Sequence, residues 1–284
     1  MTNKCIIGLC VYNNQWGLPF CLANINAIKH LFNELVIIAY CDKSKDNSLS
    51  ILKSFKQTSH IHVDILKNYK PKHRERVVNI CRARNHILKK IKKNYIDYEF
   101  FAFMDTNDYS CVGDIVPSTL QMVLSRKAEW DSISFDREAG YYDFWALSFD
   151  PFIYSFYHFE SYQSVVEQMR HAFHLLLNQY KQHHPNKFIA VFSAFNGFCL
   201  YKTQKFINCT YDTTIQPHLF DDTILQKQIN ICQQPILKNK KYDCEHRKFH
   251  LEAIKKNNAR NMICTDFLIK KFPNPPAVRG SDFL

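Results

Sequence analysis

The chain has 284 residues, of which 46% are hydrophobic and 22% are charged, and this globular composition excludes intrinsic disorder and collagen-like or low-complexity architecture for most of the chain. The 37 Lys and Arg residues outnumber the 26 Asp and Glu residues, and the net charge of +11 favours an anionic partner such as a nucleic acid, a phosphate ester or an acidic membrane face. The 11 cysteines form no CxxC pair, so we expect reduced thiols in a cytoplasm-like compartment, without a signal peptide or a transmembrane segment.

Short apolar runs and helical stretches alternate through the first third of the chain. The expected strands are 6–12, 35–41, 61–66 and 99–104, and the expected helices are 16–32, 44–55 and 74–93. Apolar strands that alternate with helices predict an α/β fold, in which helices flank both faces of a mostly parallel sheet. Ligands of such sheets bind at the carboxyl ends of the strands.

The second half of the sequence is less regular. The expected helices are 117–126, 164–183, 221–231 and 245–256, and one or two strands are expected within 189–201. An aromatic block over 141–162 predicts core packing, although aromatic walls also suit sugars or bases. No break in composition separates the halves, so we expect a single domain over 1–272, followed by an extended, proline-rich tail over 273–284.

Arg84 has an unusual position on the helix expected over 74–93. At 100° per residue it lies in the same stripe as the apolar residues Val77, Ile87 and Ile91. A guanidinium on an apolar face needs an anion or carbonyl groups, because an unpaired buried charge is costly. Two interpretations stay open: Arg84 pairs with a structural carboxylate, or it reaches a phosphate in a cleft.

An acidic turn, Asp105-Thr106-Asn107-Asp108, directly follows the strand expected over 99–104. Oxygen ligands at the carboxyl end of a strand suit Mg²⁺ or Mn²⁺, which would bridge to substrate phosphates. The alternative is a simple Asx turn, since Asp and Asn both favour turns.

Two histidines, His246 and His250, share one face of the last expected helix. A structural zinc site with Cys232 and Cys244 is one interpretation, but the spacing matches no standard zinc finger. The others are a surface histidine pair, or a single His that ligates a metal bound by the distant Asp turn.

Seven segments, taken in chain order, carry a resemblance that spans about residues 5–270. They are 6–14, 39–48, 82–85, 103–108, 141–147, 195–201 and 244–246. In this order they resemble the GT-A glycosyltransferases, in particular those of large DNA viruses and the fungal capsule mannosyltransferases. The resemblance implies a GT-A (Rossmann-like) fold and a metal-dependent enzyme, with Mn²⁺ or Mg²⁺, that moves a sugar from a nucleotide-sugar donor to a glycan, protein or lipid acceptor.

The resemblance also implies roles for single residues. The implied nucleotide-sugar site comprises Tyr12, Asn13, Asp42, Arg84 and Asp105. The implied metal ligands are Asp105, Asn107, Asp108 and His246. Asn107 stands at the third position of the Asp-x-Asp motif, where it offers a carbonyl oxygen but less charge than Asp. The implied location is the cytoplasm; for a viral protein it would be the host cytoplasm or the virion of a large DNA virus.

An inverting transferase needs a carboxylate that deprotonates the acceptor hydroxyl. The candidates are Asp222, Glu245 and Asp143. Asp222 lies in a Phe-Asp-Asp segment that resembles the Glu-Asp base motif of inverting members, but Asp221 or Asp222 could equally cap the following helix.

Two further function classes stay open. A basic nucleic-acid-binding protein would use the net charge and stack its aromatic side chains on bases. The basic residues are dispersed and form no recognised motif, so nucleic acid is the less favoured partner. The other class is a GT-A protein without activity, for which Asn107 is the best argument.

Overall fold

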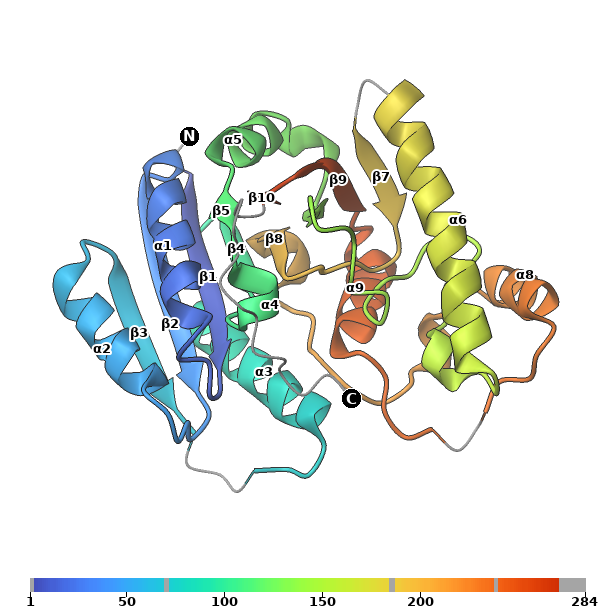
Figure 1. Ribbon diagram of the computed structural model, residues 1–284, viewed down its shortest axis with the longest axis horizontal. Helices are drawn as coiled ribbons and strands as arrows, with labels where there is room; N and C mark the ends of the chain where they lie inside the picture. Colours follow the sequence, from blue (N-terminus) through green and yellow to red (C-terminus); the bar gives the residue numbers. More distant parts are fainter. Residues whose placement is uncertain (1–2, 69–71, 184–186, 238–239, 271–284) are drawn as a thin grey trace.

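An eight-stranded sheet forms the centre of the computed structural model, which describes residues 3–68, 72–183, 187–237 and 240–270 (Figure 1). Its strands are β1 (Lys4–Val11), β2 (Glu34–Cys41), β3 (His62–Lys67), β4 (Phe100–Met104), β6 (Ser132–Asp136), β7 (Phe188–Val191), β8 (Phe198–Lys202) and β9 (Asn261–Phe267). β5 (Asp114–Ile115) and β10 (Ile269–Lys270) form a separate antiparallel pair. The tail expected over 273–284 lies outside the described residues.

The strand directions determine which loops meet. The order across the sheet is β3-β2-β1-β4-β8-β6-β9-β7. β1 pairs in parallel with β2 and β4, β2 with β3, and β6 with β9, whereas β8 is antiparallel to β4 and β6, and β7 to β9. The sheet is thus mainly parallel, as predicted. Because β8 is antiparallel, it begins at the edge where β4 ends, so residues 195–197 lie beside Asp105.

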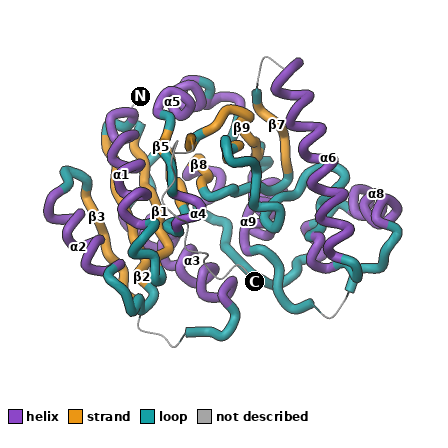
Figure 2. Tube along the Cα trace, viewed as in Figure 1, coloured by secondary structure: helices purple, strands orange, loops and turns teal. Residues whose placement is uncertain are grey.

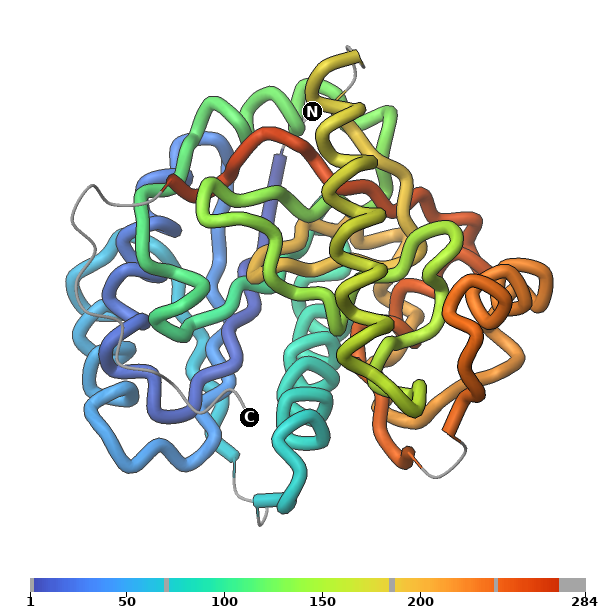
Figure 3. The backbone as a smooth tube through the Cα atoms, turned by 45° about the vertical axis from the view of Figure 1, so that its right-hand side comes forward, coloured from blue at the N-terminus to red at the C-terminus, as the bar shows by residue number. Residues whose placement is uncertain are grey.

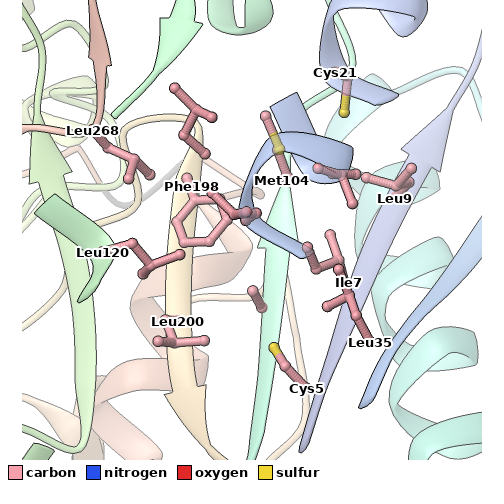
Figure 4. Packing of buried hydrophobic residues seen from close by; sticks show 14 of the residues in the cluster. Cys5, Ile7, Leu9, Cys21, Leu35, Met104, Leu120, Phe198, Leu200 and Leu268 are labelled. Carbon is pink, nitrogen blue, oxygen red and sulfur yellow. The ribbon is translucent and has the colours of Figure 1, made fainter. Parts of the chain in front are cut away.

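Helices cover both faces of the sheet, because alternate strand residues point to opposite sides. α1 (Leu18–Ile28), α2 (Ser48–Thr58) and α5 (Pro117–Ser125) pack on one face. α3 (Arg76–Asn94), α7 (Thr203–Phe206) and α9 (Glu245–Asn257) pack on the other. Figure 4 shows the first of these cores, with the labelled residues Cys5, Ile7, Leu9, Cys21, Leu35, Met104, Leu120, Phe198, Leu200 and Leu268.

The remaining helices lie at the ends of the sheet. α4 (Asp108–Cys111) is a single turn after β4, and α6 (Tyr162–His183) packs with β7 and β9. α8 (Asp222–Cys232) lies beyond α6 in Figure 1. Short 3-10 turns occur at Lys29–Leu31, Lys127–Glu129, Phe156–His158 and Pro217–Leu219. No helix within the described ranges is long and apolar enough to cross a membrane.

Two parts of the secondary-structure prediction are wrong. α2 begins at Ser48 and not at residue 44, because Lys43 has a φ of 51° and the Asp46 carboxylate accepts hydrogen bonds from the backbone N–H of Gln15 and Ser48, which makes 44–47 a turn. β6 and β9 were not expected, because polar residues interrupt their apolar pattern. These polar residues pair inside the sheet: the Ser132 hydroxyl donates to Asn261 Oδ1 at 2.7 Å.

The aromatic block over 141–162 is mostly core, as its composition predicted. Tyr141, Phe144 and Phe149 pack edge-on against Phe173 of α6, with ring centroids 4.8, 6.1 and 5.4 Å away. Figure 3 shows the green segment after β6 running alongside α6. Between β6 and α6 the chain consists mainly of loops, drawn teal in Figure 2. This side of the molecule is therefore held by side chains more than by regular backbone pairing.

Candidate active site

Three segments distant in sequence bring charged side chains together at the carboxyl end of β4. They are α3, which carries Arg84, the turn after β4, which carries Asp105, and the start of α9, which carries Glu245 and His246. Nη2 of Arg84 lies 3.6 Å from Oδ1 of Asp105. Nη1 of Arg84 donates to Glu245 Oε1 and also contacts Nε2 of His246. We call these four residues the Arg84 cluster.

Arg84 is only 4% exposed and is fully enclosed by the fold. Val77, Ile87 and Ile91 of the same stripe are buried against the sheet, and the guanidinium lies 4.6 Å from the ring centre of Phe195. Burial is the largest influence and would lower the pKa of Arg84, but Glu245, Cys10, Tyr211 and Asp105 together outweigh it and hold this pKa above its usual value. Arg84 thus pairs with a buried carboxylate and also faces the acidic turn.

His246 is buried in the same cluster and is held neutral. Its ring stacks on Phe195 with centroids 4.1 Å apart. Burial, and then the Arg84 charge, lower the pKa of His246 far below its ordinary value. Its Nδ1 has no hydrogen-bond partner among the described residues.

Asp105 is the carboxylate of the Arg84 cluster that opens toward solvent, with 28% of its side chain exposed. Its Oδ2 accepts from the hydroxyls of Ser110 and Tyr142, both at 3.4 Å, and these two hydroxyls bond each other at 2.8 Å. The backbone N–H of Asp105 donates to Gly197 at 2.9 Å, which ties the end of β4 to the start of β8. The carboxylate is therefore both oriented and accessible.

The other two polar residues of the turn serve the local backbone. Asn107 caps α4, since its Oδ1 accepts from the Ser110 N–H at 2.8 Å, and Asp108 Oδ1 accepts from the Tyr109 N–H at 3.0 Å. The Asx-turn interpretation thus describes this geometry. No group of three or more His, Cys, Asp or Glu side chains in the described part of the chain is arranged to hold a metal ion. The zinc interpretation also finds no support, because His250 bonds Ser193 at 2.8 Å and Tyr201 at 3.1 Å.

Asp143 lies near the Arg84 cluster, in the loop that follows β6. Burial, and then the Asp105 charge, raise the pKa of Asp143 to about 7. Its Oδ1 accepts from the Ala146 N–H at 3.2 Å. A carboxyl group that is half ionised near neutral pH is suited to accept a proton from a substrate.

Asn196 fixes the backbone at Asp143, and sequence reasoning gave it no role. Its Oδ1 accepts from the N–H groups of Tyr142 and Asp143 at 3.0 and 3.3 Å, and its Nδ2 donates to Phe135 at 2.8 Å. Gly197 follows with a φ of 86°, where a Cβ would lie 2.8 Å from the Tyr142 hydroxyl. The Asn-Gly pair was the available signal, because Asn tolerates a left-handed backbone and Gly allows close approach.

Tyr12, Asn13 and Asp42 follow β1 and β2 at the same edge of the sheet. Nζ of Lys72 lies 3.7 Å from the ring centre of Tyr12. Asn13 has a φ of 51° and its Oδ1 accepts from the Lys45 N–H at 2.8 Å, while buried Asp42 accepts from Asn68. These residues therefore line the loops next to the Asp105 turn.

The structure leaves Asp222 apart from the Arg84 cluster. Asp222 is exposed and is the first residue of α8, and Asp221 caps that helix by accepting from the Ile224 N–H at 3.1 Å. In Figure 1, α6 lies between α8 and the α4 turn. The helix-capping interpretation of this segment therefore matches its geometry.

The mainly parallel, eight-stranded sheet with helices on both faces has the architecture of the GT-A, Rossmann-like fold. A crystal structure of S. aureus TarS is similar at a TM-score of 0.52 and 12% identity, over 94% of this chain and 36% of that chain. S. aureus TarS 1-349 in complex with UDP-GlcNAc is similar at a TM-score of 0.50 and 12% identity, over 95% and 59%.

These structural neighbours are GT-A glycosyltransferases, and the likeness shows that this chain has the GT-A, Rossmann-like fold. The chain spans less than two thirds of the length of either solved chain. No protein-family model and no curated protein matches the sequence. The resemblance to viral and fungal members stays a prediction.

Proposed function

We propose that the protein is a nucleotide-sugar-dependent glycosyltransferase that acts on a glycan or glycoconjugate acceptor. The observation that carries the proposal is the pair of carboxyl groups, Asp105 and Asp143, beside the buried guanidinium of Arg84 at the carboxyl edge of a GT-A sheet. A neighbour with the same fold was crystallised with UDP-GlcNAc. We also propose a reducing, cytoplasm-like compartment, in which the 11 cysteines stay as thiols.

In this proposal the nucleotide-sugar donor binds at the loops after β1, β2 and β4. Tyr12, Asn13 and Asp42 contact the base and ribose, and Asp105 faces the diphosphate. Arg84 holds Asp105 and adds positive potential, but its burial keeps it from being an open phosphate ligand. These contacts orient the diphosphate as a leaving group.

A divalent cation fits this site if it binds through one carboxylate together with the phosphates of the substrate. Mn²⁺ or Mg²⁺ commonly binds through one or two carboxylates together with substrate phosphates, and the exposed, oriented carboxylate of Asp105 meets that requirement. Asn107 and Asp108 bond the local backbone and His246 contacts Arg84, whereas Asp105 keeps 28% of its side chain exposed, so we assign the cation chiefly to Asp105. When bound, the cation neutralises negative charge that develops on the diphosphate.

Asp143 is the proposed general base among the three candidate carboxylates. Glu245 is committed to Arg84, and Asp222 lies apart from the cluster. Ionised Asp143 takes the proton of the acceptor hydroxyl while the oxygen bonds to the anomeric carbon, and the bond to the diphosphate breaks with its electron pair leaving on phosphate. A base in this place makes the transfer inverting.

Binding calorimetry tests the donor half of the proposal. The wild-type protein is titrated with UDP and GDP, with and without Mn²⁺, beside Asp105→Asn and the matched surface variant Asp222→Asn. We expect Mn²⁺-dependent binding that weakens at least about tenfold in Asp105→Asn, because the variant loses its charge on the cation. Asp222→Asn should bind like the wild type. Equal binding by Asp105→Asn, or no binding of either nucleotide by the wild type, would refute the assignment.

A further inference from the structure

Most aromatic rings of the block over 141–162 are buried, but Tyr157 and Tyr162, the first residue of α6, are 40% and 45% exposed. Their ring centroids lie 6.5 Å apart, and the ring of Trp145 lies 6.3 Å from that of Tyr157. These three residues form a continuous row, which we call the aromatic row. Core packing does not account for these two rings, because a large fraction of each side chain is exposed, and grouped exposed aromatic residues commonly mark a binding surface.

The aromatic row is linked to the proposed base through the chain. Trp145 follows Asp143 by two residues, and Arg247 fixes the Trp145 carbonyl by donating from Nη2 at 2.6 Å. Nε1 of Trp145 is buried and has no hydrogen-bond partner among the described residues. The exposed rings of Tyr157 and Tyr162, with their hydroxyl edges, suit the apolar faces and the hydroxyl groups of a sugar chain.

A lysine from a distant segment completes the aromatic row. Nζ of Lys240 lies 4.2 Å from the ring centre of Tyr157, although 83 residues separate the two in sequence (240 − 157 = 83). Lys241 next to it is exposed, and the chain as a whole carries a net charge of +11. A cation over an exposed ring complements a ligand that has both a sugar face and a negative charge.

We infer that the row of Trp145, Tyr157 and Tyr162, with Lys240, binds an anionic oligosaccharide and presents its hydroxyl to Asp143. This inference rests on the proposed function and names its acceptor class. The sugar rings stack on Tyr157 and Tyr162, and a carboxylate or phosphate of the acceptor pairs with Lys240. A lipid acceptor would need a wider apolar surface than these three rings, whose polar edges and flanking lysine favour a hydrated ligand.

Calorimetry with two matched oligosaccharides tests the inference. Hexagalacturonate carries carboxylates and maltohexaose is its neutral counterpart. We expect hexagalacturonate to bind more tightly than maltohexaose. Tyr157→Ala should weaken both complexes, the anionic one about tenfold, because a stacked ring is lost. Lys240→Ala should weaken hexagalacturonate about tenfold and leave maltohexaose unchanged, because only a charge-assisted contact is lost.

Lys241→Ala is the matched control, because it removes the same charge one residue away. Equal losses in Lys240→Ala and Lys241→Ala would mean diffuse charge attraction and would overturn the inference, as would no binding of either sugar. Tighter binding of a single-stranded oligonucleotide that Tyr157→Ala abolishes would also overturn it and point to nucleic acid. UDP binding is measured on every variant. If UDP fails to bind while the sugar result holds, the donor assignment is wrong and the aromatic row stands.

Discussion

The two sides of the candidate site are built in different ways. On the side of β1, β2 and β4, parallel strands pair residue by residue and their carboxyl ends carry Asn13, Asp42 and Asp105. On the side of Asp143, the chain between β6 and α6 is mostly loop, and single buried polar side chains hold it. Backbone pairing thus positions the carboxylate of Asp105, and side-chain hydrogen bonds position that of Asp143.

Arg247 is the clearest of these buried braces. It is 1% exposed, and its guanidinium donates to the carbonyls of Trp145, Leu147 and Ile153 and to the carboxylate of Asp243. Gln228 acts similarly at Tyr154, where it bonds both the backbone N–H and the carbonyl, at 2.7 and 2.9 Å. Irregular backbone stays buried here because these side chains satisfy its polar groups.

Removal of the Arg247 guanidinium should cause the largest single loss of stability. We expect Arg247→Met to lower the free energy of unfolding by about 3–5 kcal/mol, because the buried carboxylate of Asp243 loses its guanidinium partner. The matched control is Arg260→Met, whose half-exposed guanidinium pairs with Asp131 and should contribute about 1 kcal/mol or less. Urea unfolding measures both. Similar losses in the two variants would show that the loop side does not depend on its buried brace.

Loss of the proposed base should affect the rate and the stability in opposite directions. We expect Asp143→Asn to lower turnover by about 10²–10⁴-fold while UDP binding persists. Wild-type turnover should rise with pH through about 7, the raised pKa of Asp143, because only the ionised carboxylate accepts the proton. Turnover that depends on pH in the same way in the variant would exclude Asp143 as the base.

The same raised pKa has a consequence for stability. The folded protein disfavours ionised Asp143, whose unfolded carboxyl group has a pKa of 3.8, so this residue lowers stability progressively as pH rises from about 4 to about 7. Asp143→Asn should therefore raise the melting temperature at pH 8 and leave it nearly unchanged at pH 4. Thermal unfolding at the two pH values measures this difference.

The smallest expected effect is that of Asn196→Ala, which tests whether a side-chain hydrogen bond positions Asp143. Asn196→Ala should cost about 1–3 kcal/mol of stability, because the N–H groups of Tyr142 and Asp143 lose their acceptor. A looser loop admits water, so the pKa of Asp143 should fall toward its ordinary value and the acidic limb of the pH–rate profile should move to lower pH. Gln228→Ala is the control: it should cost stability and leave the profile in place. If the pH–rate profiles of Asn196→Ala and the wild type coincide, Asn196 has a structural role only.

Much of the regular side could be predicted from local sequence pattern. The strands of residues 3–104 and the apolar stripe of α3 follow from hydrophobic periodicity, and the burial of Arg84 within that stripe is confirmed. β6 and β9 could not be predicted, because their buried serine and asparagine are stabilised by each other across the sheet. Similarly, Arg247 gave no local signal for the loop that it holds, and the Asn-Gly pair at Asn196 indicated a left-handed backbone but not the distant N–H groups that Asn196 accepts from.

The amino-acid sequence by itself determined the alternation of strands and helices, the apolar stripe that contains Arg84, and the acidic turn at the end of a buried strand. These features depend on residues a few positions apart, where backbone geometry is the same in any fold. Only the tertiary structure decided that Glu245 meets Arg84 across 161 residues of sequence, and that Asp143 has a pKa of about 7. Burial and charge act through space, so they exist only once the distant segments have packed together.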